Sequence, residues 1–527
     1  MLYGHKLCVV GIHIYSCTRR TFFAFDEKVT VASRQEESIR DAPGSVVVIT
    51  KRMILERGYR DLVDLLSDFP GFDIQERIGG QDGGTYVISR GIWGNNKIQV
   101  LLNGIPLNPM NSTHIVFGHH LSLWHLKQVE ILYGPASAIY GPDAFSGVIN
   151  LVTEEPSKWS RSFESGAYAG SHDTFEGYTL LGSSMDDDRG IRFYVHGFRT
   201  NDYNFRDEYK NKRIDNGFGL KTPLYDLERP YETPEQDYDL YFDVQLGGWR
   251  IFGEYMSTRQ PNNTQTAYYS GRSQLKKDKA EIKTFSMALK NDYEFSTYLH
   301  LKSIFNYQHY ELDPTSDYGR YDFDNFIYER SKAVEWREHI TWRPGAGTGV
   351  GLGFSVRRVS TFSYINTRDL FDRGDTYDQF PVKAVFIPGL GLRDMPPVTE
   401  KDYWTYGVYT QASHSFTPKL NGILGLRYDW DTFNHDKTLN PRVGFIFNSS
   451  DTTTLKFLCG TAFISPSAYF KYKEWLGADY VHIPPHVVGD ELEPEKISVY
   501  ELHLQKIFSN FNLNVSTFYS KARDIIH

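Results

Sequence analysis

The chain has 527 residues, a formal net charge of −8 and an aromatic content of 15%. Its length exceeds what one ordinary globular core supports, so we expect several domains or one very large β-structure. The acidic balance without a long basic block argues against a nucleic-acid partner, and Cys8, Cys17 and Cys459 are too scattered to predict a zinc site or a disulfide framework.

No apolar run approaches the roughly 18 residues that a transmembrane helix requires. Two classes therefore remain: a soluble protein, or a membrane β-barrel in which only alternate residues of each strand need be apolar. At the amino terminus, Lys6 precedes the apolar run Leu7–Tyr15, which fits the hydrophobic part of a signal peptide, yet no small-x-small cleavage site follows. We expect residues 1–26 to be a signal sequence or a mis-started leader.

Residues 27–41 form a short segment of their own. Glu27–Arg34 is β-prone and alternating, and a polar link joins it to Ala42-Pro43. An extended, unpaired segment of this kind can add as a strand to the sheet edge of another protein, with backbone hydrogen bonds supplying the affinity. The other interpretation is an ordinary first strand of the domain that follows.

Residues 42–156 predict a compact α+β domain. Val46–Thr50 reads as a strand, and Leu62, Leu65, Leu66 and Phe69 form one apolar helical stripe that ends at Pro70-Gly71. Further strands alternate with glycine-rich loops, and they are predicted at Phe72–Arg77, Tyr86–Ser89, Ile98–Asn103, Val129–Tyr133 and Gly147–Thr153.

Four motifs of this domain occur in one order and at a spacing that resembles the plug domain of the TonB-dependent receptors of Gram-negative outer membranes. They are Asp68-Phe69-Pro70-Gly71-Phe72, Ser89-Arg90-Gly91, Val100-Leu101-Leu102-Asn103-Gly104-Ile105-Pro106, and the series from Val129 to Thr153 with its Gly134-Pro135, Tyr140-Gly141-Pro142 and Ser146-Gly147 turns. The turns force the backbone through tight bends, and their small side chains allow close packing.

Residues 160–527 have the pattern of membrane strands. Leu240, Phe242, Val244 and Leu246 alternate with polar or aromatic residues, so one strand face is apolar and the other polar. Connections alternate between short and long, as in outer-membrane barrels. About 15 strands are predicted, starting near residues 163, 175, 190, 238, 249, 284, 298, 333, 348, 403, 420, 440, 453, 497 and 511.

The predicted fold is a partial transmembrane β-barrel with the α+β plug domain inside its lumen. Family barrels that house a plug have about 22 strands, and about 15 are present here. The final residues Phe518–His527 read as the middle of a strand running into a turn, so we expect a chain truncated at its carboxyl end, either a fragment or a prematurely ended reading frame.

The resemblance implies a receptor of the Gram-negative outer membrane that binds a scarce nutrient complex, most often a ferric siderophore, and imports it into the periplasm. Its partners would be TonB of the inner-membrane energy-coupling complex, outer-membrane lipid and a small nutrient or metal-complex ligand. The family carries its TonB box at the position of Glu27, Lys28, Val29, Thr30, Val31 and Ala32.

The resemblance also implies residues that seat the plug in the barrel. They are Arg90, Gly91, Asn103, Gly104, Gly134, Pro135, Tyr140, Gly141 and Gly147. Arg90 is expected to pair with barrel carboxylates, since a buried charge requires a partner. Two positions depart from the family pattern: Tyr133 stands where a second arginine is usual, and Asn103 stands where aspartate is commoner.

Ligand contacts are expected in the upper loops of the plug, at Arg77, Gln81, Trp93, Asn95, Asn108 and His114. The histidines at positions 114, 119, 120 and 125 invite a metal or haem hypothesis, but no carboxylate or cysteine pattern completes a site in the sequence. We interpret them as loop and packing histidines, with contact to an iron-bearing ligand as the alternative. We predict no metal site, no cofactor and no catalytic residues.

Two other classes stay open. One is a passive porin-like channel or a surface adhesin on the same barrel, and a seated plug with a closed pore would separate a receptor from a porin. The other is a soluble β-rich binding protein or enzyme, which partitioning into detergent would exclude.

Overall fold

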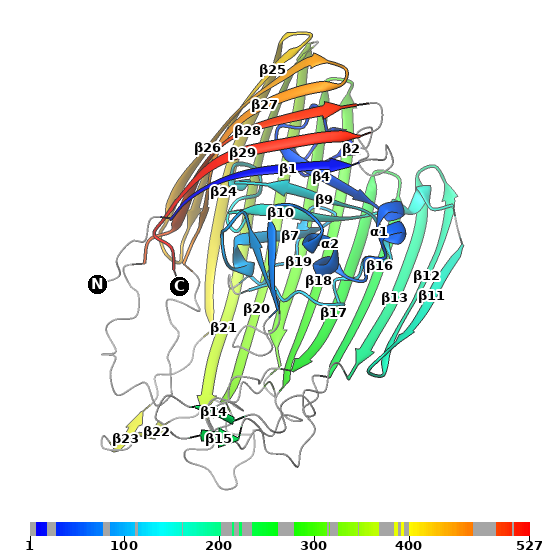
Figure 1. Cartoon of the computed structure of the whole chain (residues 1–527). Coiled ribbons are helices and arrows are strands. Elements are labelled where there is room, and N and C mark those ends of the chain that lie inside the picture. The colour runs from blue at the N-terminus through cyan, green and yellow to red at the C-terminus, as the bar shows by residue number, and fades with distance from the viewer. Residues whose placement is uncertain are drawn as a thin grey trace.

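The structure of the chain is a computed structural model, and it describes residues 7–17, 28–76, 85–110, 114–160, 162–201, 213–215, 221–223, 234–261, 279–313, 316, 325–345, 347–367, 384–387, 391–394, 400–466, 492–508 and 511–526. Within these residues a small mixed domain packs on the concave side of one large curved sheet (Figure 1). We call the small domain the plug and the large sheet the wall.

The plug is built around a five-stranded sheet of order β4-β9-β10-β7-β8, in which β10 and β7 pair in parallel. Its strands are β4 (Ser45–Thr50), β5 (Phe72–Glu76), β6 (Thr85–Ser89), β7 (Ile98–Leu102), β8 (Ile105–Pro106), β9 (Leu126–Tyr133) and β10 (Gly147–Thr153). Its helices are α1 (Lys51–Arg57), α2 (Leu62–Ser67), α3 (Ser137–Tyr140) and the 3-10 turns η1 (Asn95–Lys97) and η2 (Pro156–Lys158). The five predicted strands after Val46–Thr50 therefore all occur, within three residues of their predicted starts.

Helix α2 follows from its sequence. Asp61 caps its first turn by accepting a hydrogen bond from the Asp64 amide, and Leu62, Leu65 and Leu66 are fully buried on one stripe. Helix α1, capped by Thr50, was not predicted, because it buries only Met53 and Ile54 and so shows no repeating apolar stripe.

The wall holds the fifteen predicted strands, and thirteen of them start within three residues of the predicted position. They are β11 (Phe163–Gly170), β12 (Thr174–Asp186), β13 (Arg189–Thr200), β16 (Glu235–Leu246), β17 (Trp249–Pro261), β18 (Lys279–Ser296), β19 (Leu299–Leu312), β20 (Asn325–Gly345), β21 (Thr348–Thr367), β24 (Lys401–Thr417), β25 (Leu420–Asp431), β26 (Lys437–Ser450), β27 (Thr453–Ile464), β28 (Glu495–Ile507) and β29 (Asn512–Arg523). Strands β18 and β20 start earlier, at Lys279 and Asn325. Short ribbons β14 (Arg213–Asp215) with β15 (Lys221–Pro223), and β22 (Ala384–Ile387) with β23 (Gly391–Asp394), lie outside the wall.

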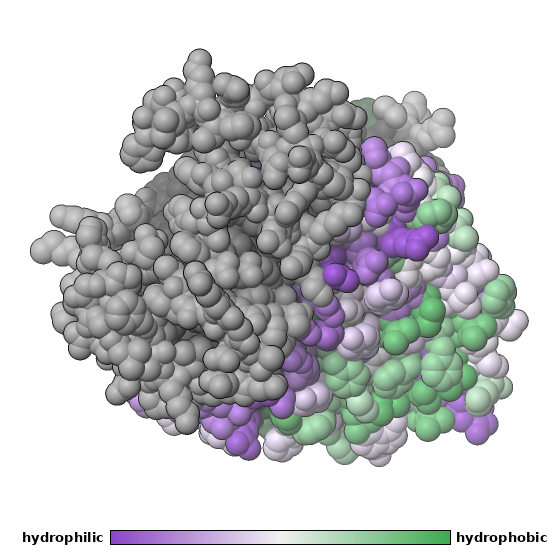
Figure 2. Space-filling model, turned by 90° about the horizontal axis from the view of Figure 1, so that it is seen from below, coloured by the Kyte–Doolittle hydropathy of each residue, from purple (hydrophilic) through white to green (hydrophobic). Residues whose placement is uncertain are grey.

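The two faces of the wall have opposite chemistry. On the face of β16 toward the plug, Asp237, Asp239 and Asp243 are fully buried. On its outer face, Tyr238 and Leu240 are 55% and 46% exposed. On the face of the molecule seen in Figure 2, hydrophobic residues gather in one region, and hydrophilic residues border it. Apolar residues outside and polar residues inside are the arrangement of a wall that faces lipid.

Residues 7–17 at the amino terminus form a strand of the wall. Strand β1 (Leu7–Cys17) pairs antiparallel with β29, from Leu7 opposite Ala522 to Cys17 opposite Asn512, so it is the outermost strand at one edge of the wall (Figure 1). Strand β11 is outermost at the other edge, and the described residues do not join the two edges. No helix among the described residues is long and apolar enough to cross a membrane.

Candidate functional site

Arg90 of the plug pairs with a carboxylate of the wall. The guanidinium forms a two-pronged salt bridge with Glu501 of β28, from Nη1 to Oε2 and from Nη2 to Oε1, each at 2.8 Å. Both side chains are almost completely buried. Such a pair in a dry environment is directional, because two parallel hydrogen bonds fix both planes.

Tyr133 completes this contact from the plug side. The Arg90 guanidinium lies 4.9 Å above the Tyr133 ring and 4.4 Å from the ring of Phe518 on β29. The Tyr133 hydroxyl donates to the Pro70 carbonyl at 2.9 Å, which holds the ring in place. Tyr133 stands where the resemblance leads us to expect a second arginine, and its ring supplies an aromatic face to Arg90.

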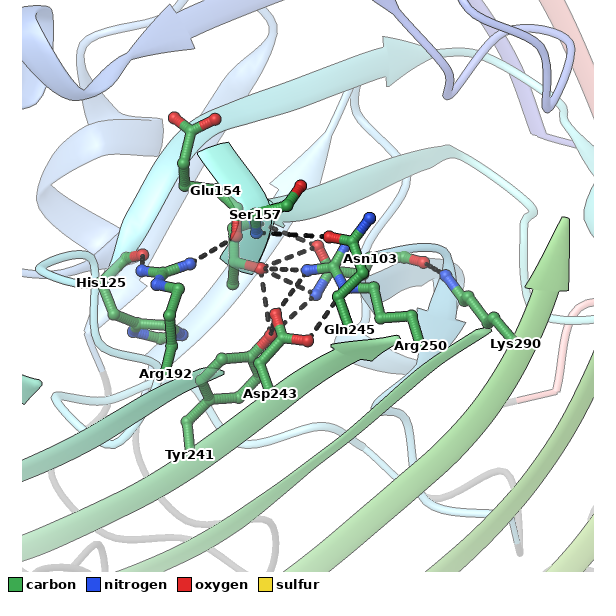
Figure 3. Close-up of polar contacts among 11 residues, drawn as sticks. Asn103, His125, Glu154, Ser157, Arg192, Tyr241, Asp243, Gln245, Arg250 and Lys290 are labelled. Carbon is green, nitrogen blue, oxygen red and sulfur yellow. Dashed lines mark hydrogen bonds and ion pairs between the residues drawn. The ribbon is translucent and has the colours of Figure 1, made fainter. Parts of the chain in front are cut away.

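A second polar contact surrounds the turn at Asn103, which has the positive φ of 50°. The Asn103 Oδ1 accepts from the Thr153 amide at 2.9 Å, and Nδ2 donates to the Tyr241 hydroxyl at 3.3 Å. Lys290 of the wall donates to the Asn103 backbone carbonyl (Figure 3). The neutral amide therefore keeps the turn and binds the wall without a charge of its own.

Wall residues extend this network (Figure 3). Arg250 donates from Nη2 to Thr153 at 2.9 Å and pairs with Asp243 at 2.6 Å, while Tyr241 donates to Asp243 at 2.7 Å. On the other side of the network Arg192 donates to the backbone carbonyls of Glu154 and His125. The carboxyl end of the plug is thus held by side chains of β13, β16, β17 and β18.

The remaining predicted seating residues lie at close approaches of the plug to itself or to the wall. A Cβ on Gly141, whose φ is +85°, would lie 2.9 Å from Arg427 Nη2, and one on Gly147 would lie 3.0 Å from the Leu132 carbonyl. The Gly104 amide donates to Asn150 at 2.9 Å. Gly91 and Gly134 have positive φ, Pro135 lies against Gly460 of the wall, and the buried ring of Tyr140 lies under Arg34.

The predicted coupling segment is docked in this structure. Lys28–Val29 (β2) pairs with Glu37–Ser38 (β3), and Val29, Val31 and Ala32 are fully buried. The Thr30 and Val31 amides donate to the Glu130 carboxylate at 3.2 and 3.0 Å. The expectation of an unpaired segment is therefore wrong for this conformation, since its backbone has partners within the chain. Glu27 lies outside the described residues.

Glu130 is the plug residue that holds the segment. Burial raises the pKa of its carboxyl group, and hydrogen bonds from Asn150, Gln128 and Thr30 partly offset this rise. Wall residues assist: Arg442 donates to the Ala32 carbonyl at 2.9 Å, and Lys456 donates to three backbone carbonyls, those of Ile39, Ala42 and Gly44. None of these residues is among the site residues predicted from the sequence. A signal was present for Glu130, which is a lone carboxylate within the apolar run of β9.

The predicted ligand-contact residues divide into two groups. Trp93 is 40% exposed, stacks on Tyr86 with ring centres 4.8 Å apart, and has His114 at its edge, so these three rings form an aromatic cluster on the plug. Arg77 and Gln81 lie outside the described residues.

Asn95 and Asn108 are held within the plug in this structure, and their contact with a ligand stays a prediction. Both are buried, and their amides bond plug backbone: Asn95 accepts from Val87 and donates to Thr85 and Ile115, and Asn108 accepts from Val100 and donates to Ile98. They hold loops onto β6 and β7. A loop asparagine gives no signal in the sequence that tells these two roles apart.

Comparisons with known proteins agree with this architecture. The profile of the TonB-dependent receptor plug domain matches residues 38–148, and that of the TonB-dependent receptor-like β-barrel matches residues 197–527. The chain belongs to the TonB-dependent receptor family.

Individual relatives carry different ligands in their names. The chain is 31% identical over 128 residues to the vitamin B12 transporter BtuB of Vibrio vulnificus, an alignment that covers 24% of this chain and 20% of the relative. It is similar in fold to the pyoverdine outer membrane receptor FpvA of Pseudomonas aeruginosa, with a TM-score of 0.66 and 16% identity over 96% of this chain and 72% of that one. It is also similar in fold to a mutant of the ferric enterobactin receptor PfeA of the same species. The TM-score is 0.67 and the identity is 15%, over 94% of this chain and 73% of that one. The chain thus spans about a fifth of the length of the curated relatives that it matches.

Proposed function

We propose that this chain is a receptor of the Gram-negative outer membrane that binds a scarce nutrient complex and passes it into the periplasm, with energy supplied by TonB. The observation that carries the proposal is a plug held inside the wall by the Arg90–Glu501 pair while the candidate coupling segment is docked on the same plug. A plug that is bound to the wall at one contact and carries a segment that a partner protein can bind at another suits a transporter driven by that partner.

A ferric siderophore is the ligand that we favour. The fold is similar to that of a pyoverdine receptor and a ferric enterobactin receptor, and the cluster of Trp93, Tyr86 and His114 offers aromatic faces to a planar ligand. Cobalamin is the competing choice, because BtuB is a relative in sequence.

Quenching of tryptophan fluorescence by ferric siderophores and by cobalamin tests the ligand. Replacing Trp93 (W93A) is expected to weaken binding at least about tenfold, which corresponds to the loss of one stacked aromatic contact. If W93A bound both ligands as tightly as the parent protein does, the aromatic cluster would not be part of the ligand-binding surface.

Deletion of residues 27–33 tests the coupling. The deletion variant is expected to bind ligand as the parent does and to lose uptake, because the partner then has no strand to pull. Unchanged uptake by cells that carry the deletion variant would contradict the TonB-driven mechanism.

A passive porin-like channel is the competing function, and a surface adhesin is another. The plug–wall contacts Arg90–Glu501 and Arg250–Thr153 favour a receptor over a porin, because they hold a folded domain against the inner face of the wall. In planar bilayers a seated plug predicts a closed pore, whereas a porin conducts continuously.

A further inference from the structure

Three ionisable side chains meet where the plug touches the wall, and none of them takes part in the seating contacts. His125 precedes β9 of the plug, Asp239 belongs to β16, and Glu254 belongs to the neighbouring strand β17. The strands are paired so that Tyr241 lies opposite Glu254 and Asp239 opposite Met256, which brings both carboxylates to the inner face. All three residues are at most 3% exposed.

Five polar atoms of these three side chains lack a hydrogen-bond partner within the described part of the chain. They are both ring nitrogens of His125, both oxygens of Asp239 and Oε2 of Glu254. His125 Nε2 lies 3.7 Å from Glu254 Oε1. Burying carboxylates without partners is costly, and native structures rarely leave such groups together without a reason.

Neighbouring carboxylates on the same interface each have at least one hydrogen-bond partner, which Asp239 lacks among the described residues. Glu176 accepts from the Trp124 indole at 2.7 Å and lies 3.0 Å from His196 Nε2. Asp237, two residues before Asp239, accepts from the His120 amide at 2.9 Å. The fold can therefore supply donors to buried carboxylates in this region, but it supplies none to Asp239.

We propose that His125, Asp239 and Glu254 bind a divalent transition-metal cation that joins the plug to the wall. One nitrogen and two carboxylate oxygens form a ligand set typical of Zn²⁺ and its neighbours. Their ligand atoms lie within 4.8 Å of one another, and binding to one ion would bring them to about 3.4 Å. Small rotations of three side chains supply that contraction, and water can fill the fourth position.

The charges suit such an ion. Two carboxylates carry a charge that a divalent cation neutralises, whereas without one they repel each other. The imidazole of His125 offers a nitrogen lone pair, the ligand type that complements two carboxylate oxygens around such an ion.

The sequence could not predict this site. Its nitrogen ligand comes from the plug and its oxygen ligands come from two wall strands more than a hundred residues further along the chain. The cation would act as a clip between the two parts, separate from the exposed aromatic cluster where we place the transported ligand.

Zn²⁺ binding to the full-length chain, purified in detergent and stripped with chelator, tests the proposal. We expect one bound Zn²⁺ per chain by metal analysis, and each of H125A, D239N and E254Q is expected to lower the affinity at least about tenfold. D237N is the matched control, because it makes the same change two residues away on the same inner face, and it is expected to leave Zn²⁺ binding unchanged.

A second measurement guards against variants that fold poorly. Co²⁺ should give visible absorption bands in the parent protein, and H125C should add the near-ultraviolet charge-transfer band of a thiolate ligand. The site would be overturned by any of three results: Zn²⁺ does not bind stoichiometrically, D237N and D239N lower the Zn²⁺ affinity equally, or H125C shows no new absorption band. A carboxyl pair that shares one proton and binds no metal is among these overturning outcomes.

Discussion

Arg90 and Glu501 bind each other through two hydrogen bonds of 2.8 Å, although 410 residues separate them in the chain and both side chains are buried. The ring of Tyr133 in the plug and the ring of Phe518 in the wall both lie against the Arg90 guanidinium. This contact therefore contributes to holding the plug against the wall.

Replacing one partner of this pair should unseat the plug. R90A leaves the Glu501 carboxylate buried without its cation, at a cost of about 3–5 kcal/mol. We expect an earlier thermal transition, and conductance in planar bilayers, in which the parent protein is expected to be closed. R52A is the control, because the Arg52–Glu56 pair is exposed and such pairs contribute at most about 1 kcal/mol.

The double variant R90M/E501L separates charge from packing. Apolar residues of similar volume restore contact without a buried charge, so this variant is expected to recover much of the stability that R90A loses. If R90A and R52A behaved alike, the pair would not hold the plug.

The turn at Gly141 should reject a side chain. Its φ of +85° strains any other residue by about 1–2 kcal/mol, and the added Cβ would lie 2.9 Å from Arg427, which also donates to the Ile139 carbonyl. G141A should therefore destabilise the plug by more than G58A, because Gly58 has φ +71° but no atom within 4 Å of an added Cβ. Thermal unfolding of both variants, followed by intrinsic fluorescence, compares them; equal shifts would show that Arg427 yields freely.

How far the sequence predicts this molecule depends on whether a signal is local. Strand alternation in the wall and the Leu62, Leu65 and Leu66 stripe of α2 are local, and the structure confirms both. The partners of Glu130 and Glu501 are not local, since strand pairing across hundreds of residues decides which charges meet. Residues such as Asn95 look like exposed loop asparagines in the sequence, but their amides are buried against plug backbone.

Docking of the coupling segment should depend on Glu130. E130A removes the acceptor of the Thr30 and Val31 amides, and hydrogen bonds to a charged group contribute about 1.5–3 kcal/mol. Hydrogen exchange at these two amides should accelerate by roughly tenfold to a hundredfold. E130Q keeps one acceptor and should show a smaller effect, and E164Q, at a plug–wall contact away from the segment, should show none.

The docked segment should also loosen as the pH rises. Burial raises the pKa of Glu37 to about 7. A hydrogen bond from Ser33 and the positive charges of Lys456 and Arg442 lower this pKa but do not cancel the rise. In the released segment this carboxyl has its ordinary pKa, near 4.5. The docked state therefore binds the proton more tightly, so docking is fully favoured below about pH 4.5 and weakens as the pH rises through 7.

A spin label at position 35 (Q35C), in a background without the native cysteines, reports this transition. Its mobility is expected to increase between about pH 5 and pH 8 in the otherwise unchanged chain. E37Q should remove the pH dependence, because an amide does not titrate, whereas E36Q should keep it, because the Glu36 side chain is exposed. A pH dependence that survives E37Q would assign the titration to another group, and a label that moves less at high pH would reverse the sign argued for Glu37.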